Sequence, residues 1–303
     1  MPELPDVELY LSALRPRIVG RRLERVRLVT PFLLRSVHPP LDEAVGRIVA
    51  GVRRIGKRIV WALEGDLFLV FHLMIAGRFK LRDRDAPIPR KVGLAGFDFA
   101  AFTLLLTEAA TRKRASLHVV HGEEALQSFD PGGLEVLASD AEAFANAMRK
   151  ESHTLKRMLT DPRIFSGIGN AYSDEILHKA RLSPFKLTRQ ITDQEILALR
   201  EAVIDTLAEW TARLQREAGD RFPEKVTAFH EGMAVHGRFG KPCPRCSSPV
   251  QRIVHGEHEV NYCPACQTEG RLLADRALSK LLKDDWPKSV EELERQRRER
   301  TSG

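Results

Sequence analysis

All four cysteines of the 303-residue chain lie in one short stretch: Cys243, Cys246, Cys263 and Cys266. Their spacing is C-x2-C, sixteen intervening residues and a second C-x2-C. Each pair can form a tight knuckle that donates two thiolates, and two knuckles complete a tetrahedral zinc site. Because sulfur occupies all four positions, the pattern predicts one structural zinc ion and no catalytic metal. Four buried cysteines that hold no metal are the alternative interpretation.

The N-terminal residues could also do chemistry. Removal of Met1, which is favoured before a small residue, leaves Pro2 with a free secondary amine. An α-amine has a pKa of about 8, against about 10.4 for lysine, so more of it is unprotonated at neutral pH. Such an amine can attack an electrophilic carbon and form an imine, and the carboxylate of Glu3 could move protons beside it. An ordinary helix start is the alternative interpretation of these residues.

The composition is that of a globular protein with a surplus of basic residues. Hydrophobic residues make up 43% of the chain, and no apolar run approaches the roughly 20 residues that span a bilayer. Because the N-terminus also lacks a basic segment leading into an apolar core, we expect a cytoplasmic protein without a membrane partner. The formal charge of +7 favours a polyanionic partner, since each phosphate neutralised by Lys or Arg releases condensed counterions.

The elements that must position these residues are first a helix and then strands. Val7, Leu11, Leu14 and Ile18 recur at helical spacing and predict a helix from Pro2 to Gly20. Short apolar or alternating runs separated by Gly, Pro and charged residues predict antiparallel strands at residues 23–29, 58–62, 67–71 and 102–106. We therefore expect a β-rich domain with one leading helix over residues 1–130.

A linker at residues 130–133 separates this domain from a helical one. Periodic apolar residues predict helices at 141–149, 154–159, 193–216 and 271–283. Thr192 and Glu195 form a capping-box pair at the start of the third of these helices. The predicted class is α+β, with a helical domain over 131–235, a zinc hairpin over 236–270, and a C-terminal helix with a fraying charged tail over 271–303.

Several segments in the correct order resemble the bacterial formamidopyrimidine-DNA glycosylase/endonuclease VIII family. They are Met1–Glu8 (MPELPDVE), Arg54–Arg58 around Lys57, Phe71–Leu73 with Ala76–Gly77, Ser166–Leu177 (SGIGNAYSDEIL), and Gly237–Arg238 with Tyr262–Gln267 (YCPACQ). The resemblance covers roughly residues 2–267. It implies an N-terminal helix plus β-sandwich domain, a helix-two-turn-helix DNA-binding domain and a C-terminal zinc hairpin.

The resemblance also implies roles for individual residues. Pro2 would be the nucleophile at the sugar C1′, Glu3 the acid and base at the ribose, and Lys57 a further catalytic residue. Lys57, His72 and Asn170 would grip phosphates around an extruded nucleotide, and Arg238 would also contact DNA. Extrusion is needed because a stacked base cannot be reached inside a duplex. The implied partner is double-stranded damaged DNA, bound by a monomer.

The sequence departs from the family pattern at residues expected to contact DNA. Ile75, preceded by Met74, stands where the family places a methionine that fills the space left by the extruded base. Arg112 is aligned with the family's intercalating arginine, and Arg114 replaces a phenylalanine. His258 stands where the family commonly has an arginine that contacts phosphates, and Arg252 or Arg271 could substitute for it.

Three functions are compatible with these observations. The first is a bifunctional glycosylase and abasic-site lyase that cleaves the strand by β,δ-elimination after forming an imine at Pro2. The second is a DNA-damage binding protein of the same fold that has lost base excision, which the departures at Ile75, Arg114 and His258 would favour. The third is a zinc-ribbon scaffold, which only the extra segment 271–303 suggests. The loop expected to contact the base, within residues 216–235, leaves oxidised purines and oxidised pyrimidines both open.

Overall fold

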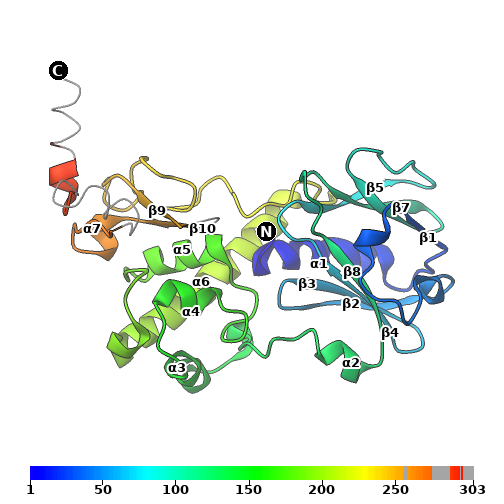
Figure 1. The fold of residues 1–303 in the computed structure, drawn as a ribbon, viewed down its shortest axis with the longest axis horizontal. Coiled ribbons are helices and arrows are strands. Elements are labelled where there is room, and N and C mark those ends of the chain that lie inside the picture. Colours follow the sequence, from blue (N-terminus) through cyan, green and yellow to red (C-terminus); the bar gives the residue numbers. More distant parts are fainter. Residues whose placement is uncertain (256–257, 275–286, 294, 296–303) are drawn as a thin grey trace. The chain divides into compact units, whose positions relative to one another are not determined.

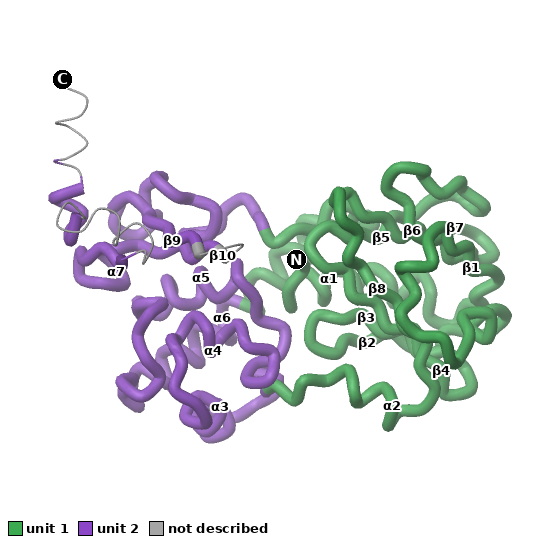
Figure 2. Tube along the Cα trace, viewed as in Figure 1, with its two compact units in different colours: residues 1–133, 207–228 green, residues 134–206, 229–303 purple. Residues whose placement is uncertain are grey.

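The computed structural model describes residues 1–255, 258–274, 287–293 and 295, which form two compact units (Figure 2). Unit 1 contains residues 1–133 and 207–228, and unit 2 contains residues 134–206 and the described residues from 229 onward. Helix α6 (Asp193–Ala218) supplies residues to both units. The four-part domain division expected from the sequence stays a prediction.

Unit 1 begins with helix α1 (Leu4–Ile18), which lies within the predicted helix at residues 2–20. The backbone N–H of Glu3 donates to the carboxylate of Asp6 at 2.8 Å, and the Glu3 side chain completes a reciprocal capping box. Such a box satisfies backbone donors that a helix start otherwise leaves without partners. Pro5 fits the first turn, where no backbone donor is required. The capping box between Glu3 and Asp6 therefore fixes where the helix begins.

Two four-stranded antiparallel sheets follow, and one of them has its strands out of chain order (Figure 1). One sheet has the order β2 (Val49–Ile55), β3 (Arg58–Leu63), β4 (Leu67–His72) and β8 (Ser116–His121). The other has the order β1 (Arg25–Leu28), β6 (Gly93–Asp98), β7 (Phe102–Glu108) and β5 (Gly77–Asp83). The four strands expected from the sequence are observed as β1, β3, β4 and β7.

Aromatic rings from both sheets pack against one another in the core of unit 1. Trp61 of β3 lies 4.8 Å from Phe71 of β4 and 5.2 Å from Phe97 of β6, measured between ring centroids. Phe71 also meets Phe79 of β5 edge to face at 5.3 Å. Edge-to-face pairs contribute about 0.5–1.5 kcal/mol beyond the area that they bury. The inner faces of the two sheets therefore form the sandwich that the family resemblance implied.

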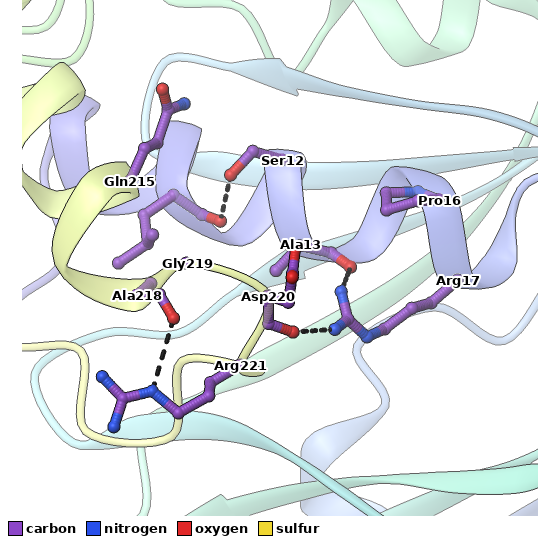
Figure 3. A pocket seen from close by; sticks show the side chains of 10 residues that line it. Ser12, Ala13, Pro16, Arg17, Gln215, Ala218, Gly219, Asp220 and Arg221 are labelled. Atoms are coloured by element: carbon purple, nitrogen blue, oxygen red, sulfur yellow. Dashed lines mark hydrogen bonds between the residues drawn. The ribbon is translucent and has the colours of Figure 1, made fainter.

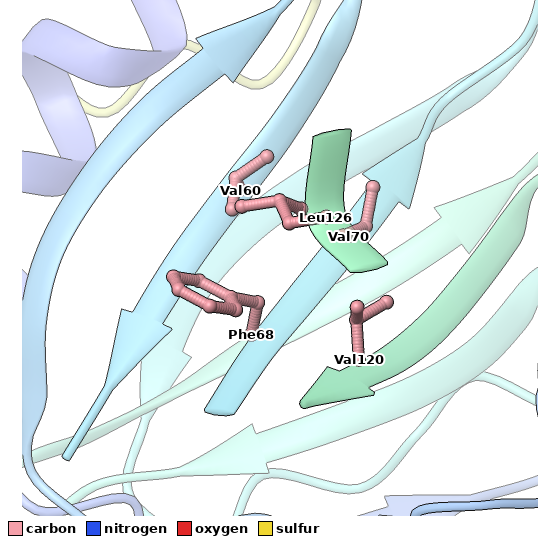
Figure 4. Close-up of a cluster of buried hydrophobic side chains, with 5 residues drawn as sticks. All are labelled: Val60, Phe68, Val70, Val120 and Leu126. Carbon is pink, nitrogen blue, oxygen red and sulfur yellow. The ribbon is translucent and has the colours of Figure 1, made fainter. Parts of the chain in front are cut away.

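The outer face of the β2–β3–β4–β8 sheet carries a second apolar cluster under helix α2 (Glu123–Gln127) (Figure 4). Its buried members are Val60, Phe68, Val70, Val120 and Leu126. Strand β4 is apolar along almost its whole length because its side chains are buried on both faces of the sheet.

Unit 2 is built from helices and a small hairpin. The helices are α3 (Ala141–Arg149), α4 (Leu155–Thr160), α5 (Asn170–Lys179) and the first part of α6. The predicted capping box of α6 is confirmed, because Thr192 N–H donates to Glu195 at 2.9 Å and Glu195 N–H donates to Thr192 Oγ1 at 3.2 Å. The hairpin comprises β9 (Gln251–His255) and β10 (His258–Tyr262), followed by helix α7 (Pro264–Gln267). Short 3₁₀ turns in the two units are η1 (Pro31–Leu33), η2 (Leu41–Ala44), η3 (Val136–Ala138) and η4 (Thr188–Gln190).

The C-terminal prediction needs one correction. Residues 271–274 are not helical, because Arg271 pairs with Ser289 in an antiparallel bridge and Leu272 N–H donates to the carbonyl of Lys288 at 3.0 Å. The remainder of the predicted helix, residues 275–283, lies outside the described residues, as do residues 294 and 296–303 of the predicted tail. Residues 290–293 form a helical turn. In the described parts of the chain, no helix has both the length and the apolar character that a membrane crossing needs.

Candidate functional site

The N-terminal pair Pro2–Glu3 is buried at the start of α1, whereas Met1 is 36% exposed. Glu3 is only 2% exposed and takes an extended backbone conformation as the N-cap residue. The capping box with Asp6 fixes this conformation. A carboxylate is thus held next to the nitrogen that becomes the terminal amine once Met1 is removed.

Two groups near the N-terminus have depressed pKa values. Burial lowers the pKa of the terminal amine, here on Met1, and the positive charges of Arg78 and Lys57 lower it further, against the carboxylates of Glu3 and Asp6. Burial also lowers the pKa of His72 to about 4, with additional contributions from Arg58, Lys57 and the terminal amine. Unit 1 therefore brings the N-terminus, Lys57 and His72 into one electrostatic neighbourhood, although they are far apart in sequence.

Lys57 is held by the tight turn that joins β2 and β3. Gly56 takes a positive φ of 56°, which a residue without a side chain adopts readily. Arg54 donates to the carbonyl of Gly56 at 3.3 Å and pairs with Glu8 of α1 at 2.8 Å. The turn that carries Lys57 is therefore tied to the same helix that carries the N-terminal pair.

His72 is the last residue of β4, and its imidazole is neutral near pH 7 because of its low pKa. Its Nδ1 lies 3.3 Å from the backbone N–H of Met74 and accepts that hydrogen bond. The proton of the neutral ring must then be on Nε2, which is a donor. A neutral N–H group can donate a hydrogen bond to a phosphate oxygen, but it adds no attraction between opposite charges.

Ile75 projects from the turn between β4 and β5 and is 59% exposed. The turn is tight: Gly77 N–H donates to the carbonyl of Leu73 at 2.8 Å, and a Cβ on Gly77 would approach that oxygen to 2.3 Å. Met74 takes a positive φ of 52° in the same turn. An apolar side chain is thus presented outward on a turn whose backbone is closely constrained.

Arg112 and Arg114 are both exposed on the connection between β7 and β8. The buried carboxylate of Glu108 organises this loop by accepting the backbone N–H groups of Arg114, at 2.9 Å, and Ala115, at 3.1 Å. Lys113 also donates to the backbone carbonyl of Glu108. No sequence pattern indicated Glu108, because a single glutamate at the end of an apolar strand gives little signal.

In unit 2, Asn170 is the first residue of α5, and Gly169 is the N-cap residue of that helix. The carbonyl of Asn170 accepts a hydrogen bond from Lys156 Nζ at 2.6 Å. The backbone N–H groups of a helix N-terminus suit phosphate oxygens. The side chain of Asn170 is half-buried, and Lys156 fixes the backbone that carries it.

Behind Asn170 lies a set of buried polar residues, the Asp174 hub, formed by Lys156, Asp174, His236 and Asn261. The carboxylate of Asp174 accepts from Lys156 Nζ at 2.5 Å and lies 2.8 Å from His236 Nδ1. It also accepts the backbone N–H of Asn261 at 3.1 Å and its side-chain amide at 3.2 Å. The hub links α4, α5 and β10, and no local sequence pattern indicated it.

The next residue, Glu175, carries a second buried carboxylate. It accepts the backbone N–H groups of Ala234 at 2.6 Å, Val235 at 2.9 Å and His236 at 2.9 Å. Burial raises the pKa of Glu175, and these three hydrogen bonds oppose the increase. Glu175 therefore anchors the segment that leads into the cysteine module.

The four cysteines come together as the sequence predicts, with all Sγ atoms within 4.8 Å of one another. The recorded Sγ–Sγ separations are 3.9 Å for Cys243–Cys266, 3.4 Å for Cys246–Cys263 and 3.5 Å for Cys246–Cys266. Tetrahedral zinc with bonds of about 2.3 Å has sulfur–sulfur edges of about 3.8 Å. The donor set therefore fits a zinc ion coordinated by four thiolates.

The other basic residues expected to contact DNA in unit 2 have mixed environments. Arg238 is half-buried and donates to the carbonyl of Pro242 at 3.2 Å. His258 begins β10, in register with His255, and its side chain lies outside what the structure describes. Arg252 lies 3.7 Å from Glu259 and stacks on the ring of Phe239 at 4.6 Å, while Arg271 lies 3.8 Å from Glu269.

A cavity of about 530 Å³ in unit 1 lies between the C-terminal parts of α1 and α6 (Figure 3). Arg17 lies beside it and donates to the backbone carbonyls of Ala13, at 2.8 Å, and Asp220. Arg221 donates to the carbonyl of Ala218 at 3.4 Å. Because α1 rises about 1.5 Å per residue, Arg17 is roughly 20 Å along the helix from Glu3. The cavity is therefore separate from the N-terminal pair.

A β-sandwich led by a helix with a buried Pro-Glu start, a helical unit with a Gly-Asn turn, and a four-cysteine hairpin together define the zinc-finger DNA-repair glycosylases. The family models that match are the formamidopyrimidine-DNA glycosylase N-terminal domain over residues 1–115 and the formamidopyrimidine-DNA glycosylase H2TH domain over 133–217. A zinc finger found in FPG and IleRS matches residues 240–268. The chain belongs to the formamidopyrimidine-DNA glycosylase family, and both the resemblance and the α+β class predicted from the sequence are confirmed.

Individual relatives are similar to this chain along most of its length. The formamidopyrimidine-DNA glycosylase of Thermus thermophilus is 34% identical over 279 residues, covering 89% of this chain and all of the relative. That of Geobacillus kaustophilus is 32% identical and covers 88% of this chain and all of the relative. The Lactococcus lactis enzyme bound to DNA with an oxidized pyrimidine superposes with a TM-score of 0.79 at 27% identity, covering 88% of this chain and all of the other. Its complex with DNA containing an abasic site gives 0.76 at 26% identity, with coverage of 88% and 99%.

Proposed function

We propose that the protein is a bifunctional DNA glycosylase and abasic-site lyase that acts on double-stranded damaged DNA. The observation that carries the proposal is the buried Pro2–Glu3 start, in surroundings that lower the pKa of the adjacent amine, which is on Met1 before processing. The same surroundings would favour the unprotonated, nucleophilic form of the Pro2 amine at neutral pH. The Lactococcus lactis relative has been observed with DNA containing an abasic site, Fapy-dG or an oxidized pyrimidine. We propose the same lesion classes as substrates here.

The proposed reaction begins when removal of Met1 frees the amine of Pro2. The nitrogen lone pair attacks C1′, the C1′–base bond breaks, and the base leaves with the bonding electron pair and takes up a proton. The Pro2 nitrogen then gives up its own proton, and Glu3 would protonate the ring oxygen as the sugar opens to an iminium ion. Loss of a C2′ proton then breaks the C3′–O bond, and a second elimination breaks the C5′–O bond. Water finally hydrolyses the imine and restores the amine.

Each unit would contribute phosphate contacts of its own, from Lys57 and His72 in unit 1 and from Asn170 and Arg238 in unit 2. Ile75, Arg112 and Arg114 would fill the space that the extruded base leaves. His258 would contact the backbone only weakly, because histidine is shorter than arginine and mostly neutral at pH 7. The four cysteines would hold one structural zinc, since four sulfur donors leave no open position for substrate. The reaction then depends on an amine rather than on a catalytic metal.

Borohydride trapping tests this proposal. The chain with Met1 removed and the same chain with an N-terminal tag would be incubated with duplexes that carry an abasic site, a formamidopyrimidine or an oxidised pyrimidine. We expect a reduced covalent adduct with the processed chain only, while a C-terminally tagged control traps as well as the processed chain. Equal trapping by the N-terminally tagged chain would exclude Pro2 as the nucleophile. Tight binding to the abasic duplex with no adduct from any chain would favour the damage-binding alternative.

A further inference from the structure

His178 of α5 lies against one of the four cysteines. Its Nε2 is 3.2 Å from Cys243 Sγ, and the two residues are 4% and 2% exposed. They are 65 positions apart in the chain, so the spacing of the cysteines gave no indication of the contact. Neither family membership nor the expected site residues give His178 a role.

The direction of the hydrogen bond follows from the chemistry of the donor set. A cysteine that binds zinc is a thiolate, which has no proton and can only accept. The imidazole must therefore donate its Nε2–H to Cys243 Sγ. The recorded distance of 3.2 Å is short for a bond to sulfur, and the surroundings are buried, where such a bond is electrostatically stronger than in water.

We propose that His178 is an outer-sphere ligand of the zinc centre, which donates to the Cys243 thiolate, orients it and raises the affinity of the site for zinc. This inference rests on the proposed structural zinc. Four thiolates around Zn²⁺ carry a net charge of −2, and the charge on the buried sulfurs of Cys243 and Cys263 is costly without compensating donors. His178 supplies one such donor to a sulfur that solvent does not reach. Loss of a comparable outer-shell partner weakens metal binding by about 10–100-fold.

Other contacts fasten the cysteine module to the end of α5 without using the His178 side chain. Arg245, between the first two cysteines, donates to the backbone carbonyl of His178 at 3.1 Å. Gln267 donates to the carbonyl of Leu182 at 2.9 Å and accepts the N–H of Cys263 at 2.8 Å. The docking of the module and the hydrogen bond to Cys243 can therefore be changed separately.

The test uses the full chain and two substitutions of one residue. His178→Phe keeps the volume and removes the donor, whereas His178→Gln keeps an N–H at a similar reach. Arg245→Gln serves as the control, because it weakens docking and leaves the bond to sulfur in place. Each protein is measured for zinc affinity by competition with a chromophoric chelator, and for the sulfur-to-metal charge-transfer band after cobalt(II) substitution. Circular dichroism checks that each variant is folded.

We expect His178→Phe to bind zinc about 10–100-fold more weakly and to shift the charge-transfer band to lower energy, because an unbonded sulfur gives up its electrons more easily. His178→Gln should restore most of both properties, and Arg245→Gln should leave the band unchanged. The inference is overturned if His178→Phe and His178→Gln both match the parent in band and affinity, or if the parent cobalt spectrum shows a nitrogen ligand in place of one sulfur. A parent chain that binds no zinc would instead refute the proposed zinc site.

Discussion

Around His72 in unit 1, burial acts on positive groups that crowd together, whereas around Asp174 in unit 2 the buried cation and carboxylate pair directly. His72 and the terminal amine both have lowered pKa values, and in both cases burial is the largest cause. Lys156, in contrast, lies 2.5 Å from the carboxylate of Asp174. Burial thus keeps the imidazole of His72 neutral in one region, whereas the carboxylate of Asp174 neutralises Lys156 in the other.

The difference shows what each arrangement is suited for. A neutral imidazole keeps an uncharged donor available, and a lowered amine pKa favours the form with a free lone pair, so the first region suits the proposed reaction. A carboxylate that accepts several hydrogen bonds cannot move without breaking them, so the second region fixes helices and hairpin in place. Substitutions should therefore affect stability strongly in the hub and chemistry strongly at the N-terminus.

The largest effect is expected from Asp174→Asn, which keeps the shape of the hub but removes its negative charge. Lys156 would then be a buried ammonium without a carboxylate, and losing one partner of such a pair costs about 3–5 kcal/mol of unfolding free energy. Urea unfolding followed by circular dichroism measures the loss. Asp193→Asn is the matched control, because its pair with Arg149 is exposed and should contribute less than about 1 kcal/mol. Similar small losses in both variants would mean that the hub does not stabilise unit 2.

The region around His72 in unit 1 is tested by measuring the free energy of unfolding of His72→Gln across a pH series. The pKa of His72 is about 4 in the folded protein, below its ordinary value of about 6.5. Between these two pH values His72 binds a proton in the unfolded chain but not in the folded protein. The free energy of unfolding therefore falls as the pH drops. The slope is up to about 1.4 kcal/mol per pH unit and should be reduced in the variant. His121→Gln, at an exposed histidine, should keep the parent slope, and an equally steep slope in His72→Gln would rule out this linkage.

Local patterns in the sequence account for much of the fold but only part of the candidate site. Helix α3 has the predicted bounds, and α6 begins at the predicted residue with the predicted Thr192–Glu195 cap, because caps and apolar periodicity act over a few residues. The cysteine knuckles were equally predictable, since metal ligands repeat at fixed spacing. Residues 271–274 were predicted wrongly because a bridge to Ser289 replaces the helical hydrogen bonds.

What the sequence did not indicate depends on contacts between distant positions. Asp174 meets Asn261 across 87 residues, and His178 meets Cys243 across 65. Such pairs leave no periodicity in the sequence. The buried state of Glu108 likewise depends on how the loop after β7 folds back, which propensity alone does not determine.

Ile75→Ala should weaken binding to damaged DNA while leaving the stability of unit 1 almost unchanged. The side chain is 59% exposed, so we expect the unfolding free energy to change by less than about 0.5 kcal/mol. If Ile75 enters the duplex as proposed, its truncation should weaken binding to an abasic-site duplex by up to about tenfold, the low end of what aromatic side chains that stack on bases contribute. Fluorescence anisotropy on lesion and undamaged duplexes measures the effect. Unchanged lesion affinity would mean that Ile75 does not enter the duplex.

The smallest effect is expected from the pair Arg82–Glu224. Its side chains are 39% and 33% exposed, so its exposure lies between that of the buried Lys156–Asp174 pair and that of the exposed Arg149–Asp193 pair. The hydrogen bond from Arg82 lowers the pKa of Glu224, so the pair stabilises the fold above the ordinary glutamate pKa and loses this contribution as the pH falls through the lowered value. A double-mutant cycle with Arg82→Gln and Glu224→Gln should give a coupling of about 0.2–1 kcal/mol near pH 7. The coupling should shrink in acid and at high salt, as expected for partly screened charges. A coupling as large as the loss of about 3–5 kcal/mol predicted for Asp174→Asn would show that burial is not what separates strong pairs from weak ones in this protein.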